Sequence, residues 1–302
     1  MSSSERLLIL GATGQLGHDL VRAAATRNIE HVGLAHDDVE VTNPESVAAA
    51  IRRVAPTLVI NCAGFHRVDA CEEDPRQAYL VNTLGGLVAA RAAAHASARC
   101  VYVSTDYVFS GDKAPPANGA LTPVTAYVES DPTGPLNVYG LSKVAGEQGV
   151  ALAGAEHLTV RVASLFGVAD ARRRGGNFIE AILKKAKEGG PLRVVSDQWM
   201  TPTYTVDAAE AIIRLALAGA SGVVHATNTG GCTWYALACE AVHLAGLDAS
   251  VEPIPAASYY SKVRRPRNSG LYTGRLASLT GAPLRSWRDA VRAYLIEKGY
   301  LT

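Results

Sequence analysis

The sequence LLILGATGQLG occupies residues 7–17 and decides the fold class. Its first four residues form a short apolar run that predicts a buried strand. Gly11, Gly14 and Gly17 then follow at intervals of three, and a helical pattern begins among them. Glycines let the backbone turn tightly and let a pyrophosphate approach the free N–H groups of a helix start. A plain glycine-rich turn is the alternative, but the strand–loop–helix context favours dinucleotide binding.

After this loop, short runs of β-branched residues alternate with alanine-rich segments that have helical periodicity. Such alternation is typical of parallel βαβ units, so we expect an α/β fold with a doubly wound parallel sheet of the Rossmann type. Asn43 before Pro44 and Asp74 before Pro75 predict two helix starts. The predicted strands of the first half are residues 7–10, 31–34, 58–61, 101–104 and 158–162.

The regular alternation of predicted strands and helices ends after about Gly167. From there the predicted connections are longer and richer in glycine and proline. Two more strands are expected at residues 193–195 and 223–226, and a last helix from Ser286 to near Gly299. We therefore expect a dinucleotide-binding domain at residues 1–166, with returns from about 197–228. Residues 167–302 are expected to form a smaller C-terminal lobe that binds substrate.

Composition excludes several classes of protein. The 302 residues carry 29 Lys and Arg against 28 Asp and Glu, a net charge of +1, so nucleic acid or a membrane surface is not expected as the main partner. The apolar run after the polar start is too short for a signal peptide or a membrane span, and we expect a cytoplasmic protein. Five scattered cysteines are expected to be reduced thiols, most of them buried.

Two carboxylates stand near the end of the second predicted strand. Asp37 lies twenty residues past Gly17 and precedes Asp38, with no arginine beside them. A carboxylate there accepts hydrogen bonds from a ribose and repels a 2′-phosphate. This favours NADH over NADPH, although NADPH stays open and the pair could also be ordinary solvated turn residues.

A second group of chemical residues follows the fourth predicted strand. Thr105 and Asp106 come directly after it, and Tyr139 and Lys143 lie one helical turn apart further on. On one helix face the ammonium is expected to sit beside the phenol and lower its pKa. The phenol can then pass a proton to a carbonyl oxygen. The combination predicts an oxidoreductase.

These motifs resemble the extended short-chain dehydrogenase/reductases and, within them, the dTDP-4-dehydrorhamnose reductase family along nearly the whole chain. The matching segments are residues 11–17, 61–64, 68–72, Asn82, 104–109, 135–143, 146–147, 177–178, 197–198, 202–203, 233–235 and 265–269.

The resemblance implies NAD(P)H-dependent reduction of the C4 keto group of a nucleotide-activated 4-keto-6-deoxyhexose, in dTDP-L-rhamnose biosynthesis. Tyr139 would be the proton donor, Lys143 would orient the nicotinamide ribose, and Thr105 would bind the reacting oxygen. The implied cofactor-binding residues are Gly11, Thr13, Gly14, Gln15, Leu16, Asp37, Glu40, Val41, Ala63, Gly64, Phe65, Tyr139 and Lys143. The implied substrate-binding residues are Thr105, Asp106, Val68, Ser164, Asn177 and Arg265. The resemblance also allows a homodimer.

Three positions depart from the family pattern. Ser164 stands where these reductases usually have a tryptophan that packs on the sugar, so the sugar specificity is open. His36 replaces an arginine that many relatives carry. Asp19 falls at a position where some bacterial members bind Mg²⁺ between subunits; we expect a solvated side chain and no metal site, and Mg²⁺ is left open.

Other polar clusters carry weaker expectations. Residues 264–267, RRPR, could bind a diphosphate, while residues 172–174 are expected in an exposed loop. His66, Asp69 and Cys71 do not have the spacing of a zinc site.

Two alternative functions remain at this point. One is a 4-ketoreductase for another NDP-deoxysugar, which Ser164 makes credible. The other is a non-catalytic NAD(P)-binding regulatory subunit, like the β subunit of methionine adenosyltransferase, which shares the fold. The joint presence of Thr105, Tyr139 and Lys143 favours the enzyme.

Overall fold

A six-stranded parallel sheet positions the chemical residues, in the order β10-β5-β4-β3-β1-β2. The computed structural model describes residues 5–116, 119–169, 176–259 and 262–301. Every strand expected in the first half is confirmed within one or two residues at each end. The strands of this sheet are β1 (Arg6–Leu10), β2 (Glu30–Leu34), β3 (Leu58–Asn61), β4 (Arg99–Thr105), β5 (His157–Val162) and β10 (Gly222–His225).

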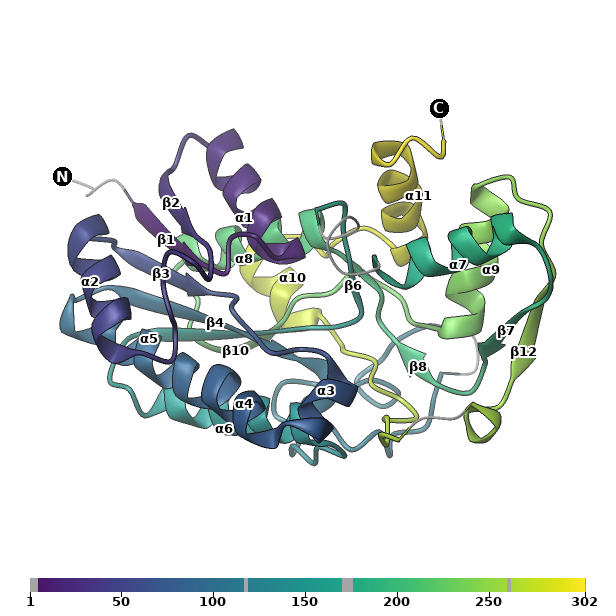
Figure 1. Cartoon of the computed structure of the whole chain (residues 1–302), viewed down its shortest axis with the longest axis horizontal. Coiled ribbons are helices and arrows are strands. Elements are labelled where there is room, and N and C mark those ends of the chain that lie inside the picture. Colours follow the sequence, from purple (N-terminus) through teal and green to yellow (C-terminus); the bar gives the residue numbers. More distant parts are fainter. Residues whose placement is uncertain (1–4, 117–118, 170–175, 260–261, 302) are drawn as a thin grey trace.

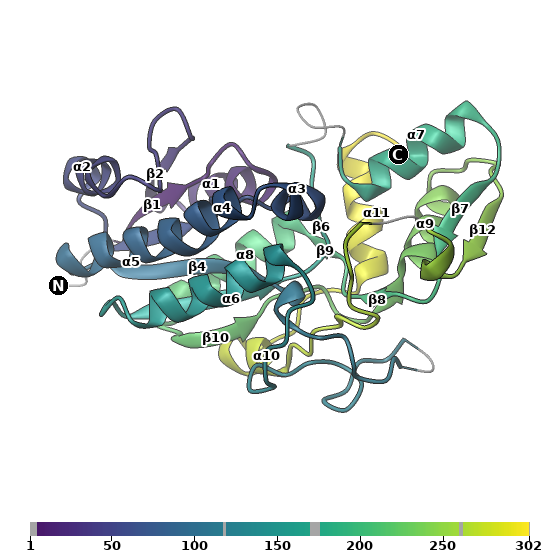
Figure 2. The ribbon, with the colours of Figure 1, turned by 60° about the horizontal axis from the view of Figure 1, so that its bottom comes forward.

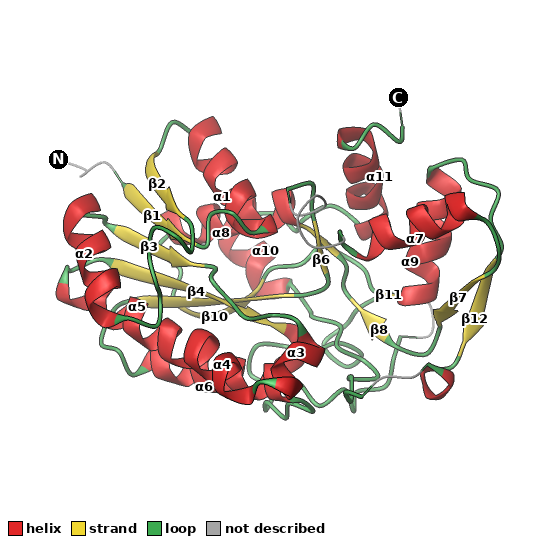
Figure 3. Cartoon of the chain, in the orientation of Figure 1, coloured by secondary structure: helices red, strands yellow, loops and turns green. Residues whose placement is uncertain are grey.

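Helices cover both faces of the sheet (Figures 1 and 3). Along β1, Leu7 and Ile9 point to one face and Leu8 and Leu10 to the other, and all four are buried. The first face is covered by α1 (Gln15–Thr26), α8 (Thr205–Leu217) and α10 (Gly274–Thr280). The second is covered by α2 (Pro44–Val54), α5 (Gly85–His95) and α6 (Val138–Ala151). The doubly wound α/β sheet is therefore as expected.

Short helical segments connect β3 to α5 and follow β4. They are α3 (Val68–Glu73), α4 (Pro75–Ala78), the π-helix η1 (Tyr79–Leu84) and the 3₁₀ turn η2 (Asp106–Val108). The predicted caps are confirmed, because the Asn43 side chain accepts hydrogen bonds from Glu45 and Ser46, and Asp74 from Gln77.

The C-terminal lobe is a second group of helices and short strands beside the carboxyl end of the sheet (Figure 2). Its core packs Phe166, Tyr204, Trp287 and Tyr294 among aliphatic side chains. The expected last helix is confirmed, since Ser286 caps α11. The strand β6 (Leu165–Phe166) leads from the sheet to the lobe. The lobe contains α7 (Phe178–Glu188), β7 (Leu192–Val195), β8 (Trp199–Met200), β9 (Thr203–Tyr204), β11 (Cys232–Thr233), α9 (Trp234–Leu244), β12 (Val251–Ile254), η3 (Ala256–Ser258) and α11 (Trp287–Glu297).

The chain crosses between the sheet and the C-terminal lobe several times. After β9 it returns to the sheet as α8 and β10, enters the lobe again as α9, returns as α10 and ends in the lobe as α11. A division after residue 166 remains our proposal for the domain boundary. Within the described part of the chain, no helix has the length and hydrophobicity that a membrane span requires.

Candidate active site

The loops after β1 and β3 meet at the carboxyl edge of the sheet, where the strand order reverses. Gly11 has a φ of 82°, and its N–H and that of Ala12 both donate to the Leu34 carbonyl at 3.0 Å. A Cβ on Gly11 would lie 2.8 Å from the Ala63 nitrogen, so only glycine fits between the loops. The switch point of the sheet is therefore shaped by the two loops expected to bind a cofactor.

The N-terminus of α1 has the features of a pyrophosphate site. Gly14 is its N-cap and supplies no side-chain cap, so the first N–H groups stay free for an anion. A Cβ on Gly17 would collide with the Gly11 carbonyl, which explains the third glycine. Thr13 is exposed on the loop, and the buried Oε1 of Gln15 has no hydrogen-bond partner. These residues fit a dinucleotide.

The acidic residues after β2 divide into different roles. Asp38 accepts a hydrogen bond from Ala35 N at 2.9 Å and closes the turn, whereas Asp37 is exposed. Thr42 donates from its N–H and its hydroxyl to Glu40 and lowers the pKa of that carboxyl. Val41 is buried in the core beside Gly85. Because the Val41 side chain packs in the core, only the backbone of Val41 is available to contact a nucleotide.

Asn82 connects the loop after β3 to α6, a role that we did not assign from the sequence. Its side-chain Oδ1 accepts from Phe65 N at 2.9 Å, and its Nδ2 donates to Phe65 O at 2.9 Å and to Ser142 Oγ at 3.0 Å. It lies in the π-helix η1, a distortion often found at functional sites. Gly64 stays exposed beside it. The only sign of this role in the sequence was that Asn82 matches the family pattern.

Thr105 and Tyr139 come together at the end of β4. Burial raises the pKa of the Tyr139 phenol, and the neighbouring Thr105 hydroxyl opposes that rise. The Thr105 hydroxyl also donates to Asp106 Oδ1 at 3.0 Å and accepts from Tyr107 N at 3.2 Å. The arrangement holds a neutral phenol, a proton donor, at the edge of the sheet.

Lys143 lies on the same helix as Tyr139, but its ammonium is oriented differently from our expectation. Nζ donates to the Val103 carbonyl at 2.5 Å and lies 4.2 Å from the centre of the Tyr102 ring. Burial lowers the pKa of Lys143 to about 7, and the charge of Glu147 opposes this. The expected lowering of the Tyr139 pKa by Lys143 is wrong for this structure, because burial of the phenol dominates.

A buried ion pair lies near Lys143, and we did not assign either of its members to the site from the sequence. Arg161 on β5 binds Glu147 through Nε at 2.8 Å and Nη2 at 2.6 Å. Ser104 Oγ donates to the same carboxylate at 2.5 Å. Glu147 therefore sits in a fixed place one helical turn after Lys143.

Arg265 contacts an aromatic residue that packs against Tyr139. It donates to the Tyr107 hydroxyl at 3.3 Å, and Tyr107 packs edge-on against Tyr139 with ring centres 6.0 Å apart. Asp69 approaches the same guanidinium at 3.8 Å. Val68 begins the partly buried α3 next to Asp69. Arg265, unlike the exposed Arg264 and Arg267, is thus connected through Tyr107 to Tyr139.

Ser164 and Asn177 are positioned by the backbone after β5. Ser164 has a φ of 43°, unusual for a residue with a Cβ, and its carbonyl accepts from Thr203 N at 3.3 Å. Asn177 caps α7 and donates to the Gly167 carbonyl and the Tyr294 hydroxyl. Its amide must release one of these bonds to donate to a substrate.

Asp19 corrects one expectation, because it is 3% exposed and not solvated. Thr205 Oγ1 donates to it at 2.5 Å and Arg22 at 3.1 Å, while Arg22 also binds Glu297 at 2.7 Å. A guanidinium therefore lies between the two carboxylates, which does not fit a metal site. Among the described residues, no group of three potential ligand side chains forms a metal centre.

The remaining polar candidates lie elsewhere or serve structure. All five cysteines are free thiols, three of them buried. Cys71 Sγ contacts the Phe65 carbonyl at 3.3 Å. Residues 172–174 lie outside the described residues.

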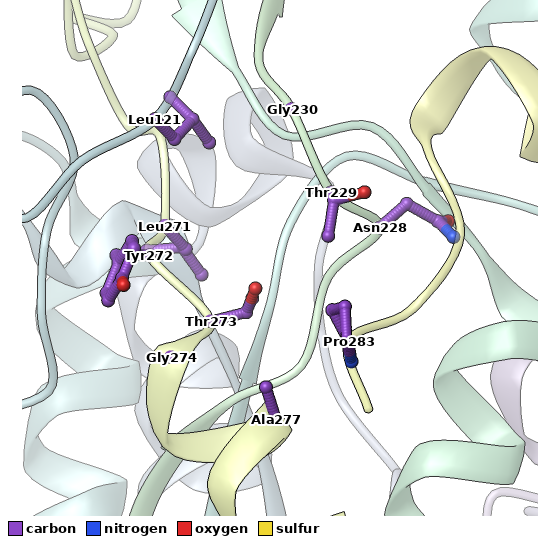
Figure 4. Close-up of a pocket in the computed structure, with 10 residues that line it drawn as sticks. All are labelled: Leu121, Asn228, Thr229, Gly230, Leu271, Tyr272, Thr273, Gly274, Ala277 and Pro283. Atoms are coloured by element: carbon purple, nitrogen blue, oxygen red, sulfur yellow. The ribbon is translucent and has the colours of Figure 1, made fainter. Parts of the chain in front are cut away.

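The pocket in Figure 4, about 220 Å³, lies between the segment after β10 and the start of α10, and none of Thr105, Tyr139 and Lys143 lines it.

Comparison with known proteins assigns the chain to a family. The model of the family described as "RmlD substrate binding domain" matches residues 5–299. The chain belongs to this family. The match spans both the sheet and the C-terminal lobe, so it includes the glycine loop of residues 11–17 as well as Thr105 and Tyr139.

Relatives from this family cover nearly the whole chain. One is the "Probable dTDP-4,6-dihydroxy-2-methyloxan-3-one 4-ketoreductase" of Streptomyces antibioticus, 39% identical over 95% of this chain and 93% of its own. Another is the dTDP-4-dehydrorhamnose reductase of Burkholderia thailandensis, 36% identical over 95% and 96%. The crystal structure of the dTDP-4-dehydrorhamnose reductase of Bacillus anthracis in complex with NADP has a TM-score of 0.88 at 30% identity, covering 98% and 100%.

Proposed function

We propose that the chain is an NAD(P)H-dependent reductase of the C4 keto group of a nucleotide-activated 4-keto-6-deoxyhexose, of the dTDP-4-dehydrorhamnose reductase type. The observation that carries the proposal is that Thr105 and Tyr139 lie together at the sheet edge that also holds the glycine loop. A binding protein without catalysis has no need for this pair. The names of the relatives support the same reaction.

A bound reduced nicotinamide supplies the hydride in such a reaction. Tyr139 donates the proton to the carbonyl oxygen, and Thr105 positions that oxygen. Lys143 lies on the same helix, and its charge acts on Cys62, directly after β3; we assign it the orientation of the ribose. Arg265, beside Tyr107, is suited to the diphosphate of the sugar nucleotide.

A second candidate is a 4-ketoreductase for another NDP-deoxysugar. Ser164 favours it, because a serine with a strained backbone stands where the family usually has an aromatic platform. For the cofactor, we propose a preference for NADH, since Asp37 is exposed beside His36 and would repel a 2′-phosphate. We also propose that the protein works in the cytoplasm as a homodimer.

The test is a panel of dTDP-, UDP- and GDP-linked 4-keto-6-deoxy sugars with NADH and NADPH, followed by NMR of the product. Oxidation of the cofactor with a dTDP-linked ketone supports the first proposal, and oxidation with another nucleotide supports the second. Cofactor binding without turnover of any ketone contradicts both and favours a regulatory subunit.

A further inference from the structure

The helix α6 begins one residue before Tyr139, and two side chains hold the N–H groups of its first turn. The first N–H groups of a helix have no partner within the helix. Asn137 is the N-cap and accepts from Gly140 N at 2.9 Å. The N–H of Val138 donates to the Glu72 carboxylate at 2.8 Å. The second bond is not local, because Glu72 belongs to α3 and lies 66 residues earlier in the chain.

The same turn is closely packed on the side of η2. A Cβ on Gly140 would come within 2.2 Å of the Tyr107 carbonyl oxygen, so the backbones of α6 and η2 are in direct contact. The Asn137 side chain also donates to the Arg264 carbonyl at 3.0 Å. These contacts hold residues 137 and 140, on either side of Tyr139. Glu72 holds the peptide nitrogen of Val138 between them, so it acts on the backbone that carries the phenol.

The helix α3 joins this turn to the loop after β3. Cys71, next to Glu72, donates from its thiol to the Phe65 carbonyl at 3.3 Å. Phe65 belongs to the loop that we expect to bind the cofactor. One face of the contact therefore fixes α3 to the cofactor loop, and Glu72 fixes α3 to the start of α6.

A carboxylate is well suited to this position. It can only accept hydrogen bonds, and negative charge is favoured at the N-terminus of a helix. We propose that Glu72 is a positioning residue, which sets the orientation of Tyr139 relative to the cofactor loop through its hydrogen bond to Val138. This inference rests on the proposed function, in which Tyr139 is the proton donor.

The chain offers a matched control beside Glu72. Glu72 and Glu73 are both exposed on α3, so replacing either one removes no buried packing. Among the described residues, Glu72 alone of the two bonds to α6. Glu72→Ala removes the accepting oxygen and the charge, whereas Glu72→Gln keeps an accepting oxygen. Glu73→Ala removes the same charge from the same helix and leaves the bond to Val138 in place.

The first test is steady-state kinetics of these three variants with a dTDP-linked 4-keto-6-deoxy sugar and reduced cofactor. Glu72→Ala should lower kcat about tenfold, since a displaced proton donor slows the reaction. The KM for both substrates should change less than about twofold, because binding is not affected. Glu72→Gln should recover kcat to within about threefold of the unaltered protein, and Glu73→Ala should match it.

Three results of these assays would overturn the inference. They are a normal kcat for Glu72→Ala, a kcat for Glu72→Gln as low as that for Glu72→Ala, and an equal loss in Glu73→Ala. An unaltered protein that turns over no keto sugar would instead overturn the proposed function, and the second test would then decide the role of Glu72.

The second test needs no substrate and follows hydrogen exchange of backbone amides along α6 by NMR. Glu72→Ala should speed exchange at Val138 at least about fivefold and leave residues 145–151 unchanged, because only the first turn loses a partner. Glu73→Ala should leave both regions unchanged. An unaltered exchange rate at Val138, or an equal rise along the whole helix, would overturn the proposal.

Discussion

Glu147 and Arg161 form a two-point ion pair inside the protein, with the carboxylate 9% and the guanidinium 4% exposed. The pair joins the catalytic helix α6 to β5. It also places a negative charge near Lys143, where that charge opposes the loss of the ammonium proton. The ion pair therefore supports both the packing of α6 and the charge of its lysine.

Removing one member of the Glu147–Arg161 pair should lower the free energy of unfolding far more than replacing both with apolar residues. Glu147→Gln should lower the free energy of unfolding by about 3–5 kcal/mol, because it leaves a buried guanidinium without its counter-charge. Glu147→Leu combined with Arg161→Met should cost less than Arg161→Met alone. Denaturant unfolding of the single and double variants measures this difference, and additive losses would contradict it.

Tyr139→Phe should abolish reduction and leave cofactor binding intact. The change removes only the phenolic oxygen, so kcat should fall at least about 100-fold, the range of general acid catalysis. Steady-state kinetics and a fluorescence titration of NADH measure the two effects. Tyr259→Phe, which alters an exposed tyrosine, is the control. A Tyr139→Phe enzyme with normal kcat would refute the proton donor.

The cofactor preference should change with the charge after β2. His36→Arg combined with Asp37→Ala replaces a carboxylate with a phosphate-binding side chain and should lower the KM for NADPH about tenfold, equal to about 1.4 kcal/mol. The KM for NADH should rise or stay constant. His95→Arg adds the same side chain on α5 as a control. A lower KM for NADPH than for NADH in the unaltered protein would contradict the proposed preference.

Asp106 should make the protein less stable as the pH rises. The pKa of this carboxyl is about 6 in the folded protein against 3.8 for an ordinary aspartate, so the folded state keeps the proton that the unfolded chain releases. Stability falls between about pH 4 and pH 6 and stays lower above that range. The advantage of Asp106→Asn over the unaltered protein should grow across this range by on the order of 3 kcal/mol.

Thermal unfolding at several pH values measures that trend. Asp112→Asn should show a difference that does not change with pH, because Asp112 is exposed. An Asp106→Asn variant whose stability difference is constant from pH 4 to pH 7 would contradict the raised pKa.

Divalent metal should have no effect on this chain. Arg22 lies between Asp19 and Glu297 and already neutralises them, so Mg²⁺ and EDTA should both leave activity and Tm unchanged. Asp19→Asn should lower the stability by about 1–3 kcal/mol, because it weakens a buried charged hydrogen bond with Thr205. A rise in Tm with Mg²⁺ would show that the arginine does not replace a cation.

The layered fold was accessible from the sequence because it depends on local patterns. The apolar runs at residues 7–10 and 58–61 are short and continuous, as in strands buried on both faces. Asn43 and Ser286 cap helices through contacts within three residues. The short strands of the C-terminal lobe, such as β8 and β9, were not predicted, because two-residue strands are fixed by distant partners and not by periodicity.

Some residues of the candidate site could also be predicted from local sequence patterns, and others could not. Gly11, Thr105 and Tyr139 lie in motifs whose spacing determines their geometry. Asn82 and the pair of Glu147 and Arg161 act through contacts between segments far apart in the chain, which spacing does not show. The orientation of Lys143 was mispredicted for a related reason: the Val103 carbonyl, on β4, competes for the ammonium. The spacing of residues on one helix does not show that a carbonyl on another element competes for the ammonium.

The repeated crossing of the chain between sheet and lobe has a consequence for inheritance. The sheet is completed by α8 and β10, which are encoded between two stretches of the C-terminal lobe. No single cut in the gene separates the sheet from the lobe, so a single crossover cannot exchange one without the other. Point substitution within the shared scaffold is therefore the direct route to a new sugar preference, and the role that we propose for Ser164 is of this kind.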